Sequence, residues 1–217
     1  MPSNNAAWYV RALAEKFPEA ISLMISPEGW DWKGQPPLPY ALDNGAWPAF
    51  KNERPWSESQ FLELVDRAAR CPLPPKFLIV PDAVADCGRT LEGWHRWYPE
   101  LKSLGWPLAF AVQDGIKTEQ VPEEADLIFV GGTTEWKLRT LRHWCDRYPC
   151  HIGQINTGKR LWQCHEACAQ SVDGTGWFRD PRTFFDLVRY LEIVYGHRIE
   201  HKQLTLFQSG IACDNFL

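Results

Sequence analysis

The sequence lacks the features that most directly assign a chain to a functional class. Its net charge is −4 at pH 7, so no overall positive charge indicates a nucleic-acid-binding protein, although a local basic patch is compatible with that total. No apolar run approaches the roughly 18 residues of a membrane span, which argues against a membrane protein. No glycine-rich dinucleotide fingerprint follows any expected strand, which weakens the case for an open, doubly wound nucleotide-binding sheet.

A secretory leader and a metal-binding motif are also missing. Residues 1–17 contain Glu15 and have the pattern of an amphipathic helix. The seven cysteines are odd in number and scattered, so we expect reduced thiols in a cytoplasmic protein. Cys164, His165 and Cys168 come nearest to a metal site, but a fourth ligand at the usual zinc spacing is missing. We therefore expect buried thiols on a helix, no metal and no other cofactor.

What the chain does contain is enough apolar material for one sizeable domain. It has 217 residues, of which 45% are hydrophobic, and 12 are tryptophan. Most of the tryptophans are expected in the core and on the surface, and some are candidates for stacking on nucleobases. We expect a single domain over residues 1–197 and a tail over residues 198–217.

Strand patterns and helix patterns alternate along the chain. Ser57 with Gln60 fits a capping box, and Asp180 with Pro181 fits the start of a last helix. Alternation of this kind is typical of a parallel sheet, and seven strands favour a compact TIM-type (β/α) barrel over a doubly wound sheet. The expected strands are 21–25, 40–43, 77–80, 108–113, 127–130, 151–155 and a very short one at Val172. The expected helices are 6–17, 57–70, 90–104, 134–148, one ending at Gln170, and 181–195.

Four expected strands end in a polar residue and a glycine. They are the segments 40–45 (YALDNG), 111–115 (AVQDG), 129–132 (FVGG) and 171–174 (SVDG). In a parallel barrel the carboxyl ends of the strands open onto one face, where the chemistry takes place. Asp43 and Asp173 stand at two of these ends, and two carboxylates across one pocket are what cleavage of a glycosidic bond requires. For Asp43 a plain Asx turn is the alternative.

Other residues at strand ends are candidates for binding a base. Gln113 could hold a base edge through paired hydrogen bonds, and Gly131 and Gly132 permit close approach of a flat ligand to the backbone. Asp82 follows Pro81 at the end of another strand. Each has a plainer alternative, since a loop-closing amide, a tight turn and a turn cap would use the same residue types.

The order of these segments resembles that of the tRNA-guanine transglycosylases and their DNA-acting relatives, the 7-deazaguanine DNA transglycosylases. Segment 42–45 is similar to the family's strand-end Asp-Ser-Gly, whose aspartate serves in acid–base chemistry, and it makes Asn44 a further base-binding candidate. Asp82 falls where the family has an aspartate that reads the base. Segment 112–115 is similar to the family's Val-Gln-Gly.

The resemblance continues over the second half of the chain. Segment 130–132, with Glu135 beyond it, is similar to a Gly-Gly segment whose backbone meets the base. Segment 151–153 resembles the family's next, histidine-containing strand, and Asp173 falls at the nucleophilic aspartate. The resemblance covers roughly residues 20–195. The resemblance implies a transglycosylase-like barrel fold.

Two departures from the tRNA enzymes favour the DNA-acting branch. The chain has no cysteine-rich zinc insertion near the end of the barrel. Its segment 171–177 reads SVDGTGW, unlike the Phe-Asp-Cys pattern of the tRNA enzymes. The chain is also shorter than most members of the family. DNA is therefore the expected partner.

The resemblance implies a mechanism with two carboxylates. A target nucleotide leaves the base stack to reach the barrel mouth. Asp173 attacks C1′ or stabilises an oxocarbenium-like state there, and Asp43 protonates the departing base and then activates the acceptor. Lys159 and Arg160 are candidate phosphate contacts, with a solvated helix start as the alternative. If water is the acceptor, the product is an abasic site.

We expect a DNA N-glycosylase that removes a base, modified as in phage DNA, in a setting such as phage defence. The first alternative is a DNA transglycosylase that exchanges guanine for a 7-deazaguanine. The second is a non-catalytic nucleic-acid-binding barrel, and retention of both Asp43 and Asp173 speaks against it. A metal-dependent sugar or phosphate enzyme is a third, which lacks a convincing ligand cluster.

The tail contains a short peptide that is similar to a known docking motif. Gln203, Leu204, Leu206 and Phe207 are similar to the Gln-Leu-x-Leu-Phe peptide by which many bacterial DNA enzymes dock onto the replication sliding clamp. Such a peptide can place its leucine and phenylalanine in a preformed apolar pocket. The alternative is that these side chains pack back on the barrel as a terminal strand.

Overall fold

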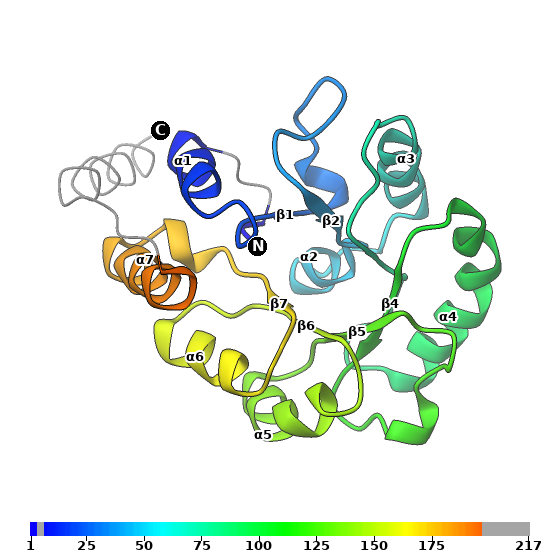
Figure 1. The fold of residues 1–217 in the computed structure, drawn as a ribbon. Helices are drawn as coiled ribbons and strands as arrows, with labels where there is room; N and C mark the ends of the chain where they lie inside the picture. Colours follow the sequence, from blue (N-terminus) through cyan, green and yellow to red (C-terminus); the bar gives the residue numbers. More distant parts are fainter. Residues whose placement is uncertain (4–6, 197–217) are drawn as a thin grey trace.

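The strands form one curled, parallel sheet. A computed structural model describes residues 1–3 and 7–196, and over them each strand pairs in parallel with the next along the chain, from β1 to β7 (Figure 1). The mixed α/β architecture and the parallel sheet agree with the alternation seen in the sequence. The strands are β1 (Leu23–Ile25), β2 (Tyr40–Leu42), β3 (Leu78–Ile79), β4 (Leu108–Val112), β5 (Leu127–Val130), β6 (Cys150–Ile152) and β7 (Ser171–Val172).

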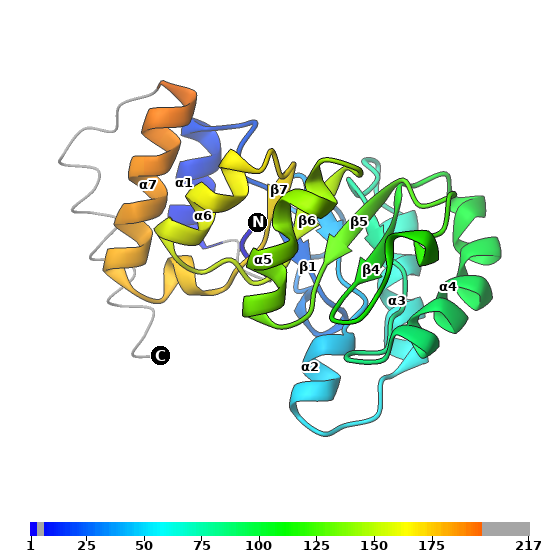
Figure 2. The same ribbon diagram turned by 90° about the horizontal axis from the view of Figure 1, so that it is seen from below.

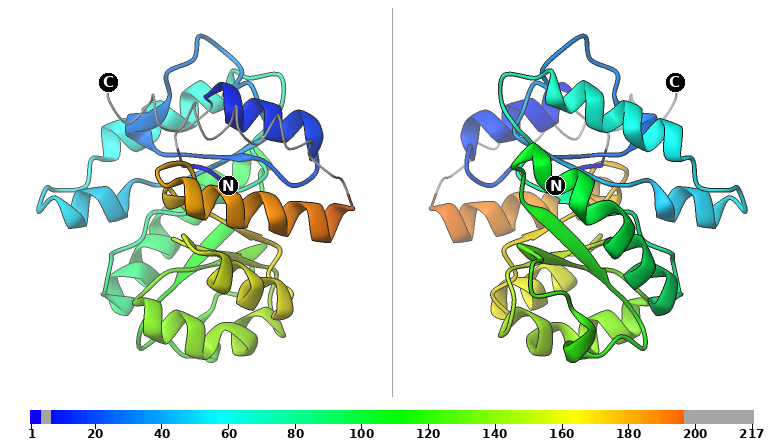
Figure 3. Two further views of the ribbon diagram at one scale, coloured as in Figure 1. Left: turned by 90° about the vertical axis from the view of Figure 1, so that its left-hand side faces the viewer. Right: turned by 90° about the vertical axis from the view of Figure 1, so that its right-hand side faces the viewer.

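Helices surround the outside of the curl. Figure 1 shows them as a ring around the strands, and the side views in Figure 3 show them running along the outer face of the sheet. These helices are α1 (Trp8–Lys16), α3 (Glu58–Ala69), α4 (Cys87–Leu101), α5 (Thr134–Cys145), α6 (Gly158–Glu166) and α7 (Pro181–Tyr195). Shorter elements are α2 (Ala46–Lys51), η1 (Pro27–Gly29), η2 (Lys102–Leu104), η3 (Thr118–Gln120) and η4 (Gly176–Phe178).

The helix starts follow the capping chemistry of the sequence. The Ser57 hydroxyl accepts a hydrogen bond from the Gln60 N–H at 3.3 Å, at the start of α3. Asp180 accepts one from the Arg182 N–H at 2.7 Å, and Pro181 opens α7. These caps satisfy N–H groups that have no partner inside the helix. The expected starts of both helices are therefore confirmed.

The TIM-type barrel expected from the sequence is present only in part: over the described residues the parallel sheet curls into a half-barrel and does not close. β1 and β7 are the two edges of the sheet and do not pair with each other. The gap between them holds residues 1–3: the Met1 amino group donates to the Val172 carbonyl, the Gly174 N–H donates to the Met1 carbonyl, and the Met24 N–H donates to the Pro2 carbonyl. Pro2 has no N–H to give to a ladder, so the seam remains a set of single contacts and not a strand.

Alternation along the strands divides the apolar residues between two cores. The larger core lies between the sheet and the outer helices and includes Leu23, Leu42 and Phe110. A smaller cluster contains the residues of opposite parity and fills the inside of the curl; it comprises Met24, Ala41, Phe77, Ile79, Ala109 and Leu127, with Met1 and Phe129 against it. Successive side chains of a strand point to opposite faces, so the parity of a residue decides which core it joins.

The described residues do not include the end of the chain. The clamp-like peptide, Gln203, Leu204, Leu206 and Phe207, lies outside the described residues, as does the tail from residue 198. Within residues 1–3 and 7–196 no helix has the length and apolar character needed to cross a membrane.

Helix α4 offers a paired test of how closely the helices pack on the sheet. A Cβ at Gly93 would lie 2.5 Å from the Pro81 carbonyl oxygen, whereas a Cβ at Gly88 would meet nothing nearer than 3.5 Å. We expect Gly93→Ala to lower the free energy of unfolding by about 1–3 kcal/mol, because backbone must move. Gly88→Ala, in the same helix, should be neutral or slightly stabilising because alanine favours helix. Urea denaturation of both variants is the measurement, and equal stability of the two would contradict this packing.

Candidate functional site

Two aspartates stand on the inner face of the curl, at the carboxyl ends of β2 and β7. Ala41 belongs to the inner cluster, so Asp43, two residues later, has the same parity. Asp173 follows Ser171 by two residues, and both side chains contact His151 of β6. The strand-end pattern of the sequence therefore corresponds to one face of the sheet, as the parallel arrangement requires.

Asp173 is held by contacts from three segments of the chain. Its Oδ1 accepts hydrogen bonds from the Gln154 N–H at 3.0 Å and from His151 Nε2 at 3.3 Å. Its Oδ2 accepts one from the Ser3 hydroxyl at 3.4 Å. The next residue is Gly174, where a larger side chain would not fit because a Cβ would lie 2.4 Å from the Ile155 carbonyl oxygen. The carboxylate is fixed on both sides of the seam between β7 and residues 1–3.

His151 is a hydrogen-bond partner of Asp173 that the pattern of strand-end residues did not indicate. Its side chain is fully buried, with its ring stacked on Phe129 and tilted against Phe77. Burial lowers its pKa, so the ring is neutral near pH 7. One neutral tautomer satisfies both of its contacts: the Ser171 hydroxyl donates to Nδ1, 2.7 Å away, and Nε2–H donates to Asp173.

The surroundings of Asp173 favour its ionised form. Burial acts to raise its pKa, but the hydrogen bond and the charge that His151 carries when protonated, the positive charge of the Met1 amino group and the hydrogen bond from the Gln154 N–H act in the opposite direction and together outweigh it. The pKa of Asp173 therefore lies below its ordinary value. Hydrogen bonds to a carboxylate stabilise the charged form, which is the physical reason for the shift.

Asp43 is in the opposite electrostatic situation. Burial raises its pKa to about 7, and the negative charges of Asp173 and Asp82 add to the effect. One hydrogen bond to the charged form, from the Gly45 N–H to Oδ1 at 3.0 Å, opposes the shift. This contact is the Asx turn that the sequence offered as an alternative. The same carboxyl group thus makes the turn and holds a proton near neutral pH.

Asn44 and Asp82 connect the end of β2 to the end of β3. The buried Asn44 amide donates to the Val80 carbonyl at 2.9 Å and to Asp82 Oδ1 at 2.8 Å. Its own Oδ1 accepts from the Ala46 N–H at 2.8 Å. Asn44 therefore positions its neighbours with all of its amide groups engaged. Burial raises the pKa of Asp82, against the hydrogen bond from Asn44.

The amide of Gln113 is engaged in a similar way. Its Oε1 accepts from the Ala85 N–H at 2.6 Å, and its Nε2 donates to the Ala83 carbonyl at 2.8 Å and to Thr90 Oγ1 at 2.9 Å. Gln113 is 3% exposed. In this conformation the side chain holds the loop that follows β3, which is the loop-closing role given above as the alternative to binding a base.

The glycine pair after β5 has a packing reason at each position. A Cβ at Gly131 would come 3.3 Å from the Phe129 ring, and its N–H donates to the Val112 carbonyl at 2.8 Å. Gly132 has φ +75°, and a Cβ there would lie 2.3 Å from Asp114 Oδ2. That carboxylate accepts two hydrogen bonds from Thr133, at 2.6 Å and 2.7 Å, which tie the loops after β4 and β5 together.

The basic residues near the site come from two helix starts. Lys159 is exposed and Arg160 half-buried, both in the first turn of α6. Lys137 of α5 was not anticipated by the sequence; it is buried, and its ammonium group donates to the Gly153 carbonyl. Burial lowers the pKa of Lys137, the negative charge of Asp173 opposes that change, and the charge of Arg160 adds to it. Lys137 thus brings a cation beneath the end of β6.

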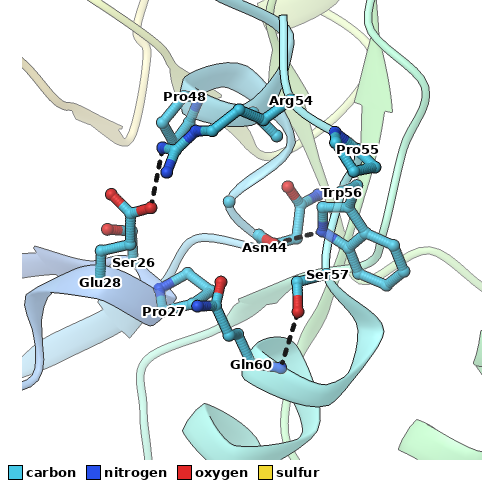
Figure 4. Close-up of a pocket in the computed structure, with 12 residues that line it drawn as sticks. Ser26, Pro27, Glu28, Asn44, Pro48, Arg54, Pro55, Trp56, Ser57 and Gln60 are labelled. Carbon is cyan, nitrogen blue, oxygen red and sulfur yellow. Dashed lines mark hydrogen bonds and ion pairs between the residues drawn. The ribbon is translucent and has the colours of Figure 1, made fainter. Parts of the chain in front are cut away.

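A cavity of about 250 Å³ lies beside Asn44 and Gly45 (Figure 4). The Arg54 guanidinium and the Glu28 carboxylate pair across one side of it at 2.9 Å, and the Trp56 indole N–H donates to the Asn44 carbonyl at 2.8 Å. Neither Asp43 nor Asp173 lines it. The cavity therefore neighbours the carboxylates without containing them.

The described part of the chain has no group of three or more His, Cys, Asp and Glu side chains placed to hold a metal ion. Cys164 is buried in α6 and Cys168 is exposed beyond its end. Asp43 and Asp173 are two carboxyl groups of this face whose pKa values are shifted in opposite directions. One group is suited to give a proton and the other to stay negative.

The shifted pKa of Asp43 predicts how stability depends on pH. A folded-state pKa of about 7 lies above the usual unfolded value of about 3.9. The stability that the neutral carboxyl provides is therefore full below about pH 4 and is lost as the pH rises towards 7 and above. Asp43→Asn removes this dependence, so its free energy of unfolding should fall less between pH 5 and pH 8 than that of the wild type. Urea denaturation at both pH values tests this.

Asp31→Asn, at an exposed carboxyl, is the matched control and should leave the wild-type pH dependence unchanged. Asp82 remains in the Asp43→Asn variant and contributes a dependence of the same sign, because burial raises its pKa too. An Asp43→Asn variant that loses as much stability as the wild type over this range would contradict a carboxyl group that is neutral in the folded state.

No protein-family model matches the chain, and no curated protein matches it.

Proposed function

We propose that the protein is a DNA N-glycosylase that uses Asp43 and Asp173 to cleave the bond between a base and its deoxyribose. The observation that carries the proposal is the opposite shift of two carboxyl pKa values on one face of the sheet, with Asp43 raised to about 7 and Asp173 lowered. Environments that shift the pKa values of two carboxyl groups in opposite directions leave one group protonated, to act as an acid, and the other ionised. Glycosidic-bond enzymes need these two roles.

In the proposed reaction Asp43 gives its proton to the departing base. The C1′ centre gains positive charge as the bond breaks, and the anionic Asp173 stabilises that charge or attacks C1′ directly. His151 keeps Asp173 oriented through Nε2–H, while Ser171 fixes the tautomer of the ring. Asp43, now ionised, then accepts a proton from the water that completes hydrolysis.

The substrate class comes from the chemistry of the site and from the resemblance noted in the sequence. A base in a duplex must leave the stack to reach the inner face of the sheet. The absence of a zinc insertion supports DNA over tRNA, and a modified base, as in phage DNA, gives the reaction a setting in host defence. Exchange of one base for another uses the same two carboxyl groups, with a free base in place of water.

Base release is the direct test of this proposal. Natural and modified DNAs are incubated with the purified protein, and any free base is identified by mass spectrometry. Asp43→Asn and Asp173→Asn should each slow release by at least about 10²- to 10⁴-fold, because each removes a group that acts in the transition state. Asp31→Asn is the control and should act as the wild type does.

The outcomes of that test separate the candidate functions. Release of a base with an abasic product supports hydrolysis, whereas incorporation of added labelled guanine or 7-deazaguanine without an abasic product supports exchange. Wild-type rates in either aspartate variant would remove that residue from the mechanism. DNA binding without release from any DNA would favour the non-catalytic alternative.

The dependence of the rate on pH follows from the two shifted pKa values. The proposed acid must be protonated, so release under saturating conditions should fall as the pH rises through about 7, where Asp43 ionises. Release should also fall in acid, where Asp173 takes up a proton, at a pH below the ordinary range for aspartate. Asp43→Asn should lose the alkaline limb of the profile. An alkaline limb of unchanged position in that variant would contradict the assignment.

A further inference from the structure

Helix α2 carries two large aromatic side chains that the described residues leave open to solvent. Trp47 is 44% exposed and Phe50 is 53% exposed, and their ring centroids lie 6.0 Å apart with 30° between the ring planes. We call these two residues the α2 aromatic pair. A single exposed apolar side chain is ordinary, but neighbouring aromatic rings at one place on the surface indicate a binding function.

The pair is placed by the same residues that form the candidate site. α2 starts directly after Asp43 and Asn44, whose side chains accept hydrogen bonds from the Gly45 and Ala46 N–H groups. At the other end, the Arg54 N–H donates to the Ala49 carbonyl at 2.9 Å. In Figure 1 the helix lies inside the ring of outer helices, and in Figure 2 it projects beyond them. The aromatic pair thus stands on a short, fixed projection from the end of β2.

We propose that the α2 aromatic pair stacks on the nucleobases of the DNA strand next to the nucleotide that enters the site. This inference rests on the proposed function and names how that function holds its substrate. Planar aromatic rings stack on bases of any sequence, since every base has a π-face. Enzymes that extrude a nucleotide also need side chains that occupy or cover the interrupted stack. Lys51, exposed at the end of α2, supplies a cation for the neighbouring phosphate.

The size of the exposed surface favours bases over a second protein chain. A stable protein interface buries about 800 Å² on each partner. One aromatic side chain buries at most about 150–250 Å², and roughly half of each ring of the pair is already covered by its own chain. Two half-exposed rings fall well short of a dimer interface, whereas one or two stacked bases match them in size and shape.

The test measures DNA binding without any requirement for base release. The probes are fluorescein-labelled oligothymidylate of about 15 nucleotides, within the length range that single-strand-binding sites cover, and the same strand in a duplex with oligodeoxyadenylate. Fluorescence anisotropy gives the affinity over a series of salt concentrations. Trp47→Ala and Phe50→Ala should each weaken binding about tenfold, and Trp47→Phe should retain most of the affinity because it keeps a ring.

Two controls separate stacking from charge and from general loss of apolar surface. Leu73→Ala removes another large exposed side chain, 63% exposed, which precedes the start of β3 and so lies at the opposite end of the sheet, and it should bind as the wild type does. Lys51→Ala should reduce the slope of log affinity against log salt by about one, whereas the two aromatic variants should leave that slope unchanged. Thermal unfolding confirms that each variant is folded.

Three results would overturn the proposal. They are wild-type affinity in the Trp47→Ala/Phe50→Ala double variant, failure of the intact protein to bind either form of DNA, and a change from dimer to monomer in that variant with unchanged DNA affinity. The last result would assign the pair to contact between copies of the chain. A protein that binds DNA through the pair but releases no base would refute the proposed glycosylase and leave the aromatic contact standing.

Discussion

The contact between His151 and Asp173 is the interaction on which the electrostatics of this face depend. A neutral, fully buried imidazole donates one hydrogen bond to the carboxylate and is itself held by Ser171. That bond, together with the Gln154 N–H, keeps Asp173 ionised despite burial. The negative charge of Asp173 then helps to hold the proton on Asp43, after the larger effect of burial. The ionised form of Asp173 therefore favours the protonated form of Asp43, and the rings of Phe77 and Phe129 pack against the histidine that holds Asp173.

The open seam of the sheet has a direct bearing on this state. Residues 1–3 lie between β1 and β7, and their contacts with the sheet run through carbonyl and N–H groups on both edges. The Ser3 hydroxyl reaches Asp173 from that segment. The carboxylate that carries the negative charge is consequently fixed from β6, from the loop after β6 and from the seam. Ser3 pairs with Met24 of the inner cluster in an isolated parallel bridge, and Met1, two residues earlier, packs against the same cluster, so the Ser3 hydroxyl reaches the inner face with the parity of a strand residue.

The order of the strands, their parallel pairing and the inward position of Asp43 and Asp173 followed from local pattern, because strand parity and strand-end glycines are written in neighbouring residues. The opening between β1 and β7 did not, since it depends on how residues 1–3, far from β7 in the sequence, contact both edges of the sheet. Helix α2 was also missed, because Trp47, Pro48 and Phe50 are poor indicators of a helix. His151 makes its contacts across strands, and Lys137 makes its contact from α5 to the loop after β6, so neither is indicated by short-range spacing in the sequence. Residue types at strand ends likewise do not distinguish an amide that faces a ligand from one that is hydrogen-bonded within a loop, as Asn44 and Gln113 are.

The internal hydrogen bonds of the Asn44 and Gln113 amides bear on how the proposed enzyme would recognise a base. Each has its donors and acceptor paired inside the protein, and each joins a strand end to the loop after β3 or to the start of α2. Removing such an amide would disturb the loop before it affected any base, since a buried partner left unpaired costs more than the bond itself contributes. In the proposed glycosylase, discrimination between bases would then come from groups that remain open at the carboxyl ends of the strands, and the loops that these amides fix are the elements that carry such groups. Asn44 and Gln113 would contribute to specificity by holding these loops in place, and not by reading a base.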